Sequence, residues 1–144
     1  MKKLMFILLS LVSIACYSQK YVSNSSEIVA LGGVDTSIVS NKAYELMVNI
    51  DTERTDASFA NHLNRQYIQV RDLNTGMTEI INVYDCATRR DGTIYCDALE
   101  NESEMWGVVV IDKHAPKPFI LVERYLGRGS RMKLIKSVKY FIEL

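Results

Sequence analysis

The sequence predicts a mainly β protein, either a small antiparallel sandwich, an open barrel or a curved sheet, that follows an N-terminal signal peptide. Two observations support this fold class. Short apolar segments recur along the chain, and turn residues such as Gly, Asn, Asp and Pro separate them. In the last segment, residues 132–144, apolar and polar side chains alternate as in a strand with one buried face. A helix over residues 131–144 is the alternative for this segment.

The first 18 residues have the character of a signal peptide. Two lysines precede an apolar run over residues 4–15, which is too short to cross a bilayer about 30 Å thick as a helix. Cleavage after Ser18 places small residues at both recognition positions, Ser18 and Cys16. Cys16 also ends a box similar to the lipidation site of bacterial lipoproteins, with Ser13 in place of the usual aliphatic residue. A lipid anchor at Cys16 is therefore the alternative to soluble export.

Residues 19–144 are expected to form a single β-rich domain, because no linker, repeat or low-complexity tract divides them. The chain has 17 basic and 17 acidic residues, and the leader removes two lysines and no acid. The mature net charge is then 15 − 17, near −2. Such a balance gives no long-range field for nucleic acid or for an anionic membrane, so neither is expected as a partner.

Strands are expected over several short segments, and one stretch between them is polar. The expected strands cover residues 27–31, 43–50, 67–72, 77–86, 84–89, 93–98, 106–112, 119–126 and 132–144. The continuous apolar run at 108–111 indicates a strand buried on both faces. Residues 19–26 are expected to be an extended lead-in, and residues 51–66 to contain one short helix around 58–63.

Two cysteines remain after the leader, and the sequence places them on one hairpin. Export puts Cys86 and Cys96 in an oxidising compartment, where an even pair indicates a disulfide. Residues 90–92 form a three-residue loop in which Gly92 takes the left-handed position. Facing residue numbers then sum to 182, so Cys86 faces Cys96. A two-residue loop would misalign the cysteines. The alternatives to a disulfide are then a pair of buried thiols or a low-affinity metal pair.

The same register sets Asp85 opposite Asp97. Facing like charges destabilise a sheet unless water or a cation separates them. Solvated carboxylates are the simpler interpretation, and a cation site shared with acids of residues 100–104 is the alternative. No metal is expected, because His62 and His114 lack zinc-site spacing to the cysteines and no calcium-loop pattern is present.

Residues 33–37, with the sequence Gly-Val-Asp-Thr-Ser, are the only string similar to a catalytic signature. They resemble the Asp-Thr-Gly or Asp-Ser-Gly triplet of retroviral-type aspartic proteases, small β-rich domains that dimerise to bring two aspartates together. Leu126-Gly127-Arg128 is similar to the apolar-Gly element that supports this triplet. The resemblance implies catalysis by Asp35, although Ser37 stands where that family has glycine. The alternative is a turn in which these side chains cap backbone donors.

The function expected from the sequence is that of an exported, non-enzymatic binding protein of the bacterial cell envelope, such as an inhibitor, an immunity protein or an adhesin-like domain. No catalytic residue and no cofactor are expected. The expected location is periplasmic or extracellular, with membrane contact only through a lipid at Cys16. A small envelope hydrolase using Asp35 and a structural envelope component are the alternatives.

The expected partner is a protein or an envelope polymer. Residues 97–104 contain four acids and no base, whereas residues 124–139 contain six bases and no acid. These are solvated faces in the simpler interpretation, or a basic edge that contacts an acidic partner. Exposed loops usually provide binding residues, and large aromatic and guanidinium side chains dominate interface energies. The candidate binding residues are therefore Arg90, Trp106, Arg128 and Arg131.

Overall fold

The computed structural model describes residues 18–50, 66–100, 105–127 and 129–144, and all nine strands in these residues belong to one antiparallel sheet. The strands are β1 Ser18–Leu31, β2 Val34–Ser40, β3 Tyr44–Asn49, β4 Gln66–Asp72, β5 Thr78–Thr88, β6 Ile94–Glu100, β7 Met105–Asp112, β8 Phe119–Leu126 and β9 Lys133–Glu143. A single 3-10 turn, η3 Gly129–Arg131, lies between the last two.

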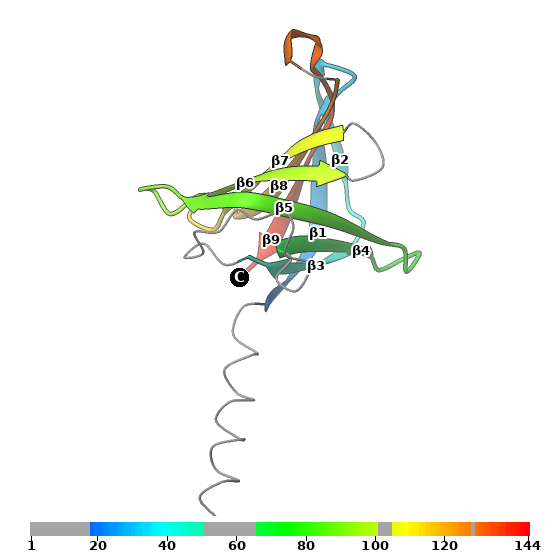
Figure 1. Ribbon diagram of the computed structural model, residues 1–144. Coiled ribbons are helices and arrows are strands. Elements are labelled where there is room, and N and C mark those ends of the chain that lie inside the picture. Colours follow the sequence, from blue (N-terminus) through cyan, green and yellow to red (C-terminus); the bar gives the residue numbers. More distant parts are fainter. Residues whose placement is uncertain (1–17, 51–65, 101–104, 128) are drawn as a thin grey trace, which may run out of the picture.

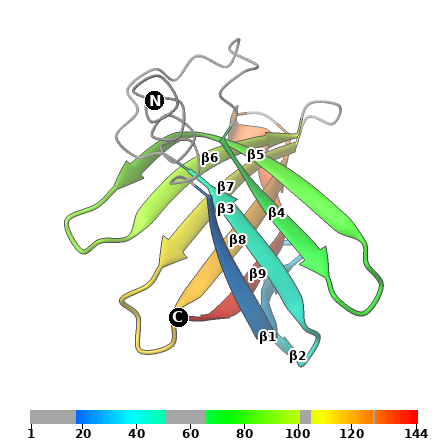
Figure 2. The same cartoon turned by 90° about the horizontal axis from the view of Figure 1, so that it is seen from below.

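The sheet closes into an eight-stranded barrel with one extra strand. The strand order is β2-β1-β3-β4-β5-β6-β7-β8-β9, and β1 also pairs with β9. Figure 2 views this ring from below, with β1 between β3 and β9. The mainly β prediction is confirmed, and the helical alternative for residues 131–144 is wrong, because β9 pairs with β8 on one side and β1 on the other.

Strand β1 serves both the barrel and a sheet that extends beyond it. Its first part, Ser18 to Ser23, pairs with β3, and its last part, Ser26 to Leu31, pairs with β2. The extension, at the top of Figure 1, consists of residues 30–35 and the described part of residues 126–135, and is called the projecting end below. Two expectations are wrong here. Residues 19–26 belong to β1 rather than to an extended lead-in, because they pair with β3 and β9. Residues 34–37 belong to β2 rather than to a turn, because β2 pairs with β1.

The barrel interior is filled by side chains from alternate positions of every barrel strand, as an eight-stranded barrel allows. Leu46, Ile68, Val109 and Ile120 have no exposed surface. The full core cluster is Tyr21, Leu46, Val48, Ile68, Val70, Ile81, Val83, Cys96, Ala98, Val109, Ile111, Ile120, Val122, Val138, Tyr140 and Ile142. Val110, between two core residues of β7, is buried as well. The prediction of a strand buried on both faces over residues 108–111 is thus confirmed for its last three residues.

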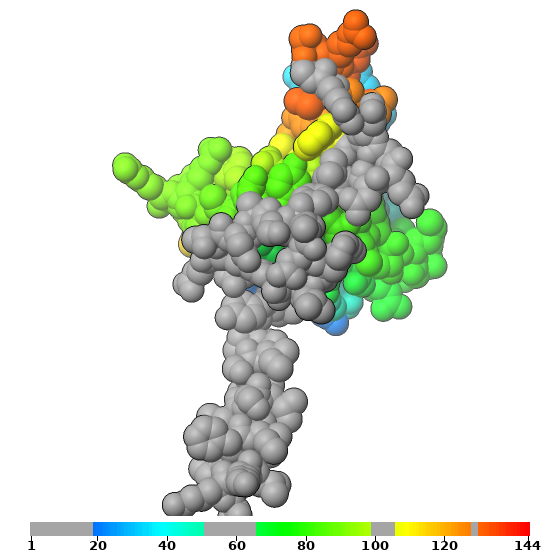
Figure 3. Space-filling model, viewed as in Figure 1, coloured from blue at the N-terminus to red at the C-terminus, as the bar shows by residue number. Residues whose placement is uncertain are grey.

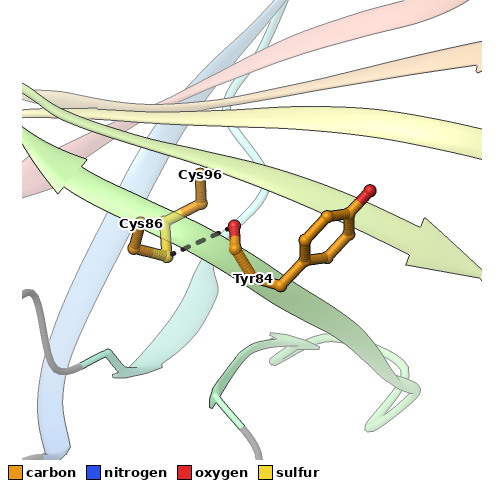
Figure 4. Close-up of a disulfide and its surroundings, with 3 residues drawn as sticks. All are labelled: Tyr84, Cys86 and Cys96. Atoms are coloured by element: carbon orange, nitrogen blue, oxygen red, sulfur yellow. Dashed lines mark hydrogen bonds between the residues drawn. A yellow bond between two sulfur atoms is a disulfide. The ribbon is translucent and has the colours of Figure 1, made fainter. Parts of the chain in front are cut away.

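The β5–β6 hairpin contains the disulfide between Cys86 and Cys96 that the sequence predicts (Figure 4). The three-residue loop is also confirmed. The Arg89 amide donates to Thr93 O at 2.8 Å, and Gly92 has a φ of 84°. Ala87 faces Tyr95 in the expected register.

A β-bulge changes that register beyond the disulfide. Asp85 has a φ of 50°, in the left-handed region that Asp tolerates better than most residues. The pairing shifts by one residue between Tyr84 and Ala87, so Tyr84 rather than Asp85 faces Asp97. The predicted Asp85–Asp97 pairing is therefore wrong, although the two carboxylates remain near enough to interact, and Asp85 helps to raise the pKa of Asp97.

Three expectations fall on residues that the structure does not describe. The leader with Cys16 falls largely on residues 1–17, the short helix around 58–63 lies within residues 51–65, and the second half of the acidic segment 97–104 lies within 101–104. Among the described residues, no helix has the length and apolar character needed to cross a bilayer.

Candidate functional site

The projecting end exposes several large apolar side chains to solvent. Val34, in β2, has 67% of its surface exposed, and Met132, just before β9, has 48%. Figure 3 shows this end standing clear of the barrel. The exposed apolar residues of the projecting end are Leu31, Val34, Leu126, Met132 and Ile135. Exposed apolar patches often mark interaction sites, so the projecting end is the candidate functional site.

Glycines give the projecting end its fixed backbone. Gly32 and Gly33 both have positive φ and form a two-residue hairpin loop between the paired residues Leu31 and Val34. The Gly32 amide donates to the carbonyl oxygen of Ile135 at 2.7 Å, which ties the β1–β2 hairpin to β9. The exposed apolar residues are thus displayed on a constrained loop pair, which lowers the entropy lost on binding.

The loop between β8 and β9 tolerates only glycine at its first position. Gly127 has a φ of 98°, and a Cβ atom there would lie 2.6 Å from the carbonyl oxygen of Arg131. The chain then turns through η3 and returns as β9. This close approach brings the backbone of Arg131 back against the end of β8.

The described charges at the projecting end are mostly positive. Arg131 and Lys133 are exposed, and Lys136, three residues further along β9, is partly exposed. Among the described residues of the projecting end, Asp35 on β2 is the one acidic residue. An apolar surface beside cations of this kind suits a partner surface that combines apolar and acidic side chains.

A second polar feature lies inside the barrel beneath the projecting end. Arg124 of β8 forms an ion pair with Glu79 of β5, two strands that are not neighbours in the sheet. The side chain of Arg124 is 16% exposed and that of Glu79 is 46% exposed. In register with Arg124, β7 has Gly107 and β6 has Ala98, both small residues.

Two tyrosines lie close to this ion pair. Tyr140 is buried, and its ring contacts that of Tyr44 edge to face with centroids 5.1 Å apart. Burial, and to a smaller extent the negative charge of Glu79, raises the pKa of Tyr140 to about 12. Both phenols therefore stay neutral at physiological pH, because burial and the nearby Asp72 raise the pKa of Tyr44 as well.

The structure separates the four predicted binding residues. Arg131 lies on the projecting end, and Arg128 falls on a position that the structure does not describe. Trp106, at the start of β7, is partly exposed and faces Tyr125 of β8 near the base of the projecting end. Arg90 lies in the β5–β6 hairpin loop, far from the projecting end in Figure 1. Arg131 and Trp106 both lie at or near the projecting end, whereas the β5–β6 loop that contains Arg90 lies too far away to belong to the same binding surface.

The aspartates singled out in the sequence do not form a cluster. Asp35 is exposed on β2, paired in register with Ala30. The pKa of Asp97 is raised, mainly by burial and further by Asp85. Within the described ranges, no group of three His, Cys, Asp or Glu side chains is placed to hold a metal ion. Catalysis by Asp35 stays a prediction.

Sequence reasoning missed the exposed apolar residues of the projecting end. Leu31 and Val34 flank two glycines, and a two-residue Gly-Gly hairpin loop was the signal that could have placed them at a tip. The sequence places Arg124 in the basic stretch 124–139, whereas in the structure its side chain is mostly buried and forms an ion pair with Glu79. Lys139, from the same stretch, lies over the Phe119 ring at 4.5 Å. The expected basic edge is therefore divided between the interior, the barrel wall and the projecting end.

Comparison with known proteins gives no assignment. No protein-family model matches the chain, and neither a curated protein nor a solved structure matches it significantly.

Proposed function

We propose that this chain is an exported, non-enzymatic binding protein that recognises an acidic partner protein through its projecting end. The observation that supports this function best is the set of exposed apolar side chains beside Arg131 and Lys133 on a constrained, protruding loop pair. Apolar anchors supply most of the affinity in such an interface, and the surrounding charges supply orientation and association rate.

The projecting end lies at the far end of β1 from the N-terminal leader, so we expect the partner to bind on the side of the molecule opposite the leader. Ser18 and Leu31 lie at opposite ends of this strand of 14 residues, which spans about 40 Å at about 3.3 Å per residue. A lipid at Cys16 would therefore leave the projecting end far from the membrane that holds the lipid. The disulfide agrees with an exported location, because such bonds persist in oxidising compartments.

Site-specific crosslinking tests the proposal. A photoreactive side chain placed at Met132 should capture a partner in the cell envelope of the exporting bacterium. The same side chain at Met77, an exposed methionine next to the β4–β5 turn, is the matched control and should capture none. Equal capture at both positions would contradict a binding role for the projecting end.

Charge reversal then tests the chemistry of the partner. Arg131→Glu combined with Lys133→Glu should weaken binding of the captured partner by at least about tenfold, and high salt should weaken the wild-type complex. Arg90→Glu is the matched control, because Arg90 is an exposed base in the β5–β6 hairpin loop. Binding that responds to Arg90→Glu and not to the double variant would overturn the proposed surface.

A further inference from the structure

Strand β2 presents an unpaired edge with two adjacent exposed apolar side chains near its end. It pairs with β1 along one side, and no strand in the described residues pairs with its other side. Its side chains Ile38 and Val39 are 47% and 63% exposed. Because neighbouring side chains of a strand point to opposite faces, apolar surface flanks this free edge on both faces.

Most devices that protect an edge strand are missing from β2. Exposed edges are commonly guarded by lysine, proline, inward-pointing charges or a bulge. The sequence of β2, Val-Asp-Thr-Ser-Ile-Val-Ser, has no lysine or proline, and its one charge is Asp35 near the start. The irregular pairing lies between the pairs Ala30–Asp35 and Ile28–Ile38. The end of the strand from Ile38 to Ser40 therefore pairs regularly with β1, carries two exposed apolar side chains, and has no strand partner on its other side in the described residues.

We propose that β2 pairs antiparallel with β2 of a second copy of this chain, so that the two sheets join at this edge. The charged residues at the two ends of β2 favour a second copy of the chain as the partner and an antiparallel orientation of the two strands. Asp35 lies near one end of β2, and Lys42 follows the other end. A two-fold antiparallel arrangement brings Asp35 of each copy to the end where Lys42 of the other copy lies, whereas a parallel arrangement sets like charges together.

The pairing of two β2 strands provides both backbone hydrogen bonds and apolar side-chain contacts. The free amide and carbonyl groups of β2 gain partners in the other copy, as in recognition by strand addition. Ile38 and Val39 lie near the two-fold axis and lose exposed surface on both faces of the joined sheet. The antiparallel assembly places the two projecting ends at opposite ends of the paired strands, and it does not depend on the partner proposed above.

Sedimentation equilibrium of the purified protein tests the second copy directly. Wild-type protein should be a dimer, and Val39→Lys should weaken the dimer by at least about tenfold. Ile80→Lys is the matched control, because Ile80 is 57% exposed on β5, a strand whose two edges are both paired. Circular dichroism and thermal unfolding verify that both variants stay folded.

Charge exchange tests the direction of pairing. Asp35→Lys or Lys42→Asp alone should weaken the dimer, and the two changes together should restore it. A wild-type chain that is monomeric at every soluble concentration would overturn the proposal, as would an Ile80→Lys variant that dissociates as readily as Val39→Lys. A monomer that instead takes up an extended segment of another protein at β2 would also overturn the second copy as occupant.

Discussion

Removing the Cys86–Cys96 bond should cost this protein about 2.7 kcal/mol of stability. The two cysteines are 10 residues apart in sequence. In the chain-entropy description, closing a loop of about 10 residues removes about 9 cal/mol/K from the unfolded state, which is about 2.7 kcal/mol at 25 °C. For a domain of about 125 residues, with an unfolding entropy near 2.1 cal/mol/K per residue, this loss lowers the melting temperature by about 10 °C.

The cleanest comparison is between the oxidised and the reduced wild-type protein in urea. Reduction leaves the core packing of Cys96, which is buried, almost unchanged, so the difference reports the crosslink. The midpoint should fall and the urea dependence should steepen, because the reduced chain exposes more surface on unfolding. The Cys86→Ala/Cys96→Ala variant is the control, and reductant should not affect it. Oxidised and reduced proteins that agree within about 1 kcal/mol would refute the loop-closure reasoning.

Three further changes test the interior and the hairpin. Arg124→Met should cost about 1 kcal/mol in urea unfolding, because Glu79 loses its partner yet keeps water contact; no loss would mean that the ion pair contributes nothing. Gly107→Ala should cost about 1–3 kcal/mol in thermal unfolding, since its Cβ would lie 2.9 Å from a backbone oxygen; an unchanged melting temperature would contradict this crowding. Asp97→Asn should stabilise by under about 0.5 kcal/mol at pH 7, because burial and Asp85 raise the pKa of Asp97 in the folded state. Because the pKa of Asp97 is raised in the folded state, the wild type gains stability as the pH falls. The greater stability of Asp97→Asn should therefore vanish near pH 3.8. A variant that is still more stable than the wild type below that pH would contradict the raised pKa of Asp97.

The fold class and most strands were predictable because they depend on patterns between residues that are close in sequence. The alternation in β3 and β9 shows directly in the sequence, and the β5–β6 hairpin follows from Gly92 and the cysteine spacing. The first half of β1 was not predictable. Its polar residues Ser23 and Ser26 are buried against neighbouring strands, and only the pairing with β3 and β9 shows that they belong to a strand.

The candidate site was predicted only in part. Arg131 was identified by its residue type in a loop, which is the signal that sequence provides for a binding residue. The apolar residues around it were not identified, because a single exposed leucine or valine is ordinary and only the fold gathers them. Arg124 and Glu79 are distant in sequence, and their pairing depends on barrel closure, which no local pattern encodes.

Strand β1 pairs with β9, and Asn24 donates from its side chain to Glu143 at 2.7 Å across 119 residues of sequence. Contacts of such long range form late and slowly in folding. The projecting end is made from the same two distant parts of the chain, β1–β2 and β8–β9. Under the proposed function, a chain still emerging from the export machinery therefore has no complete binding surface, and the proposed partner is engaged only after the last strand has arrived and the barrel has closed.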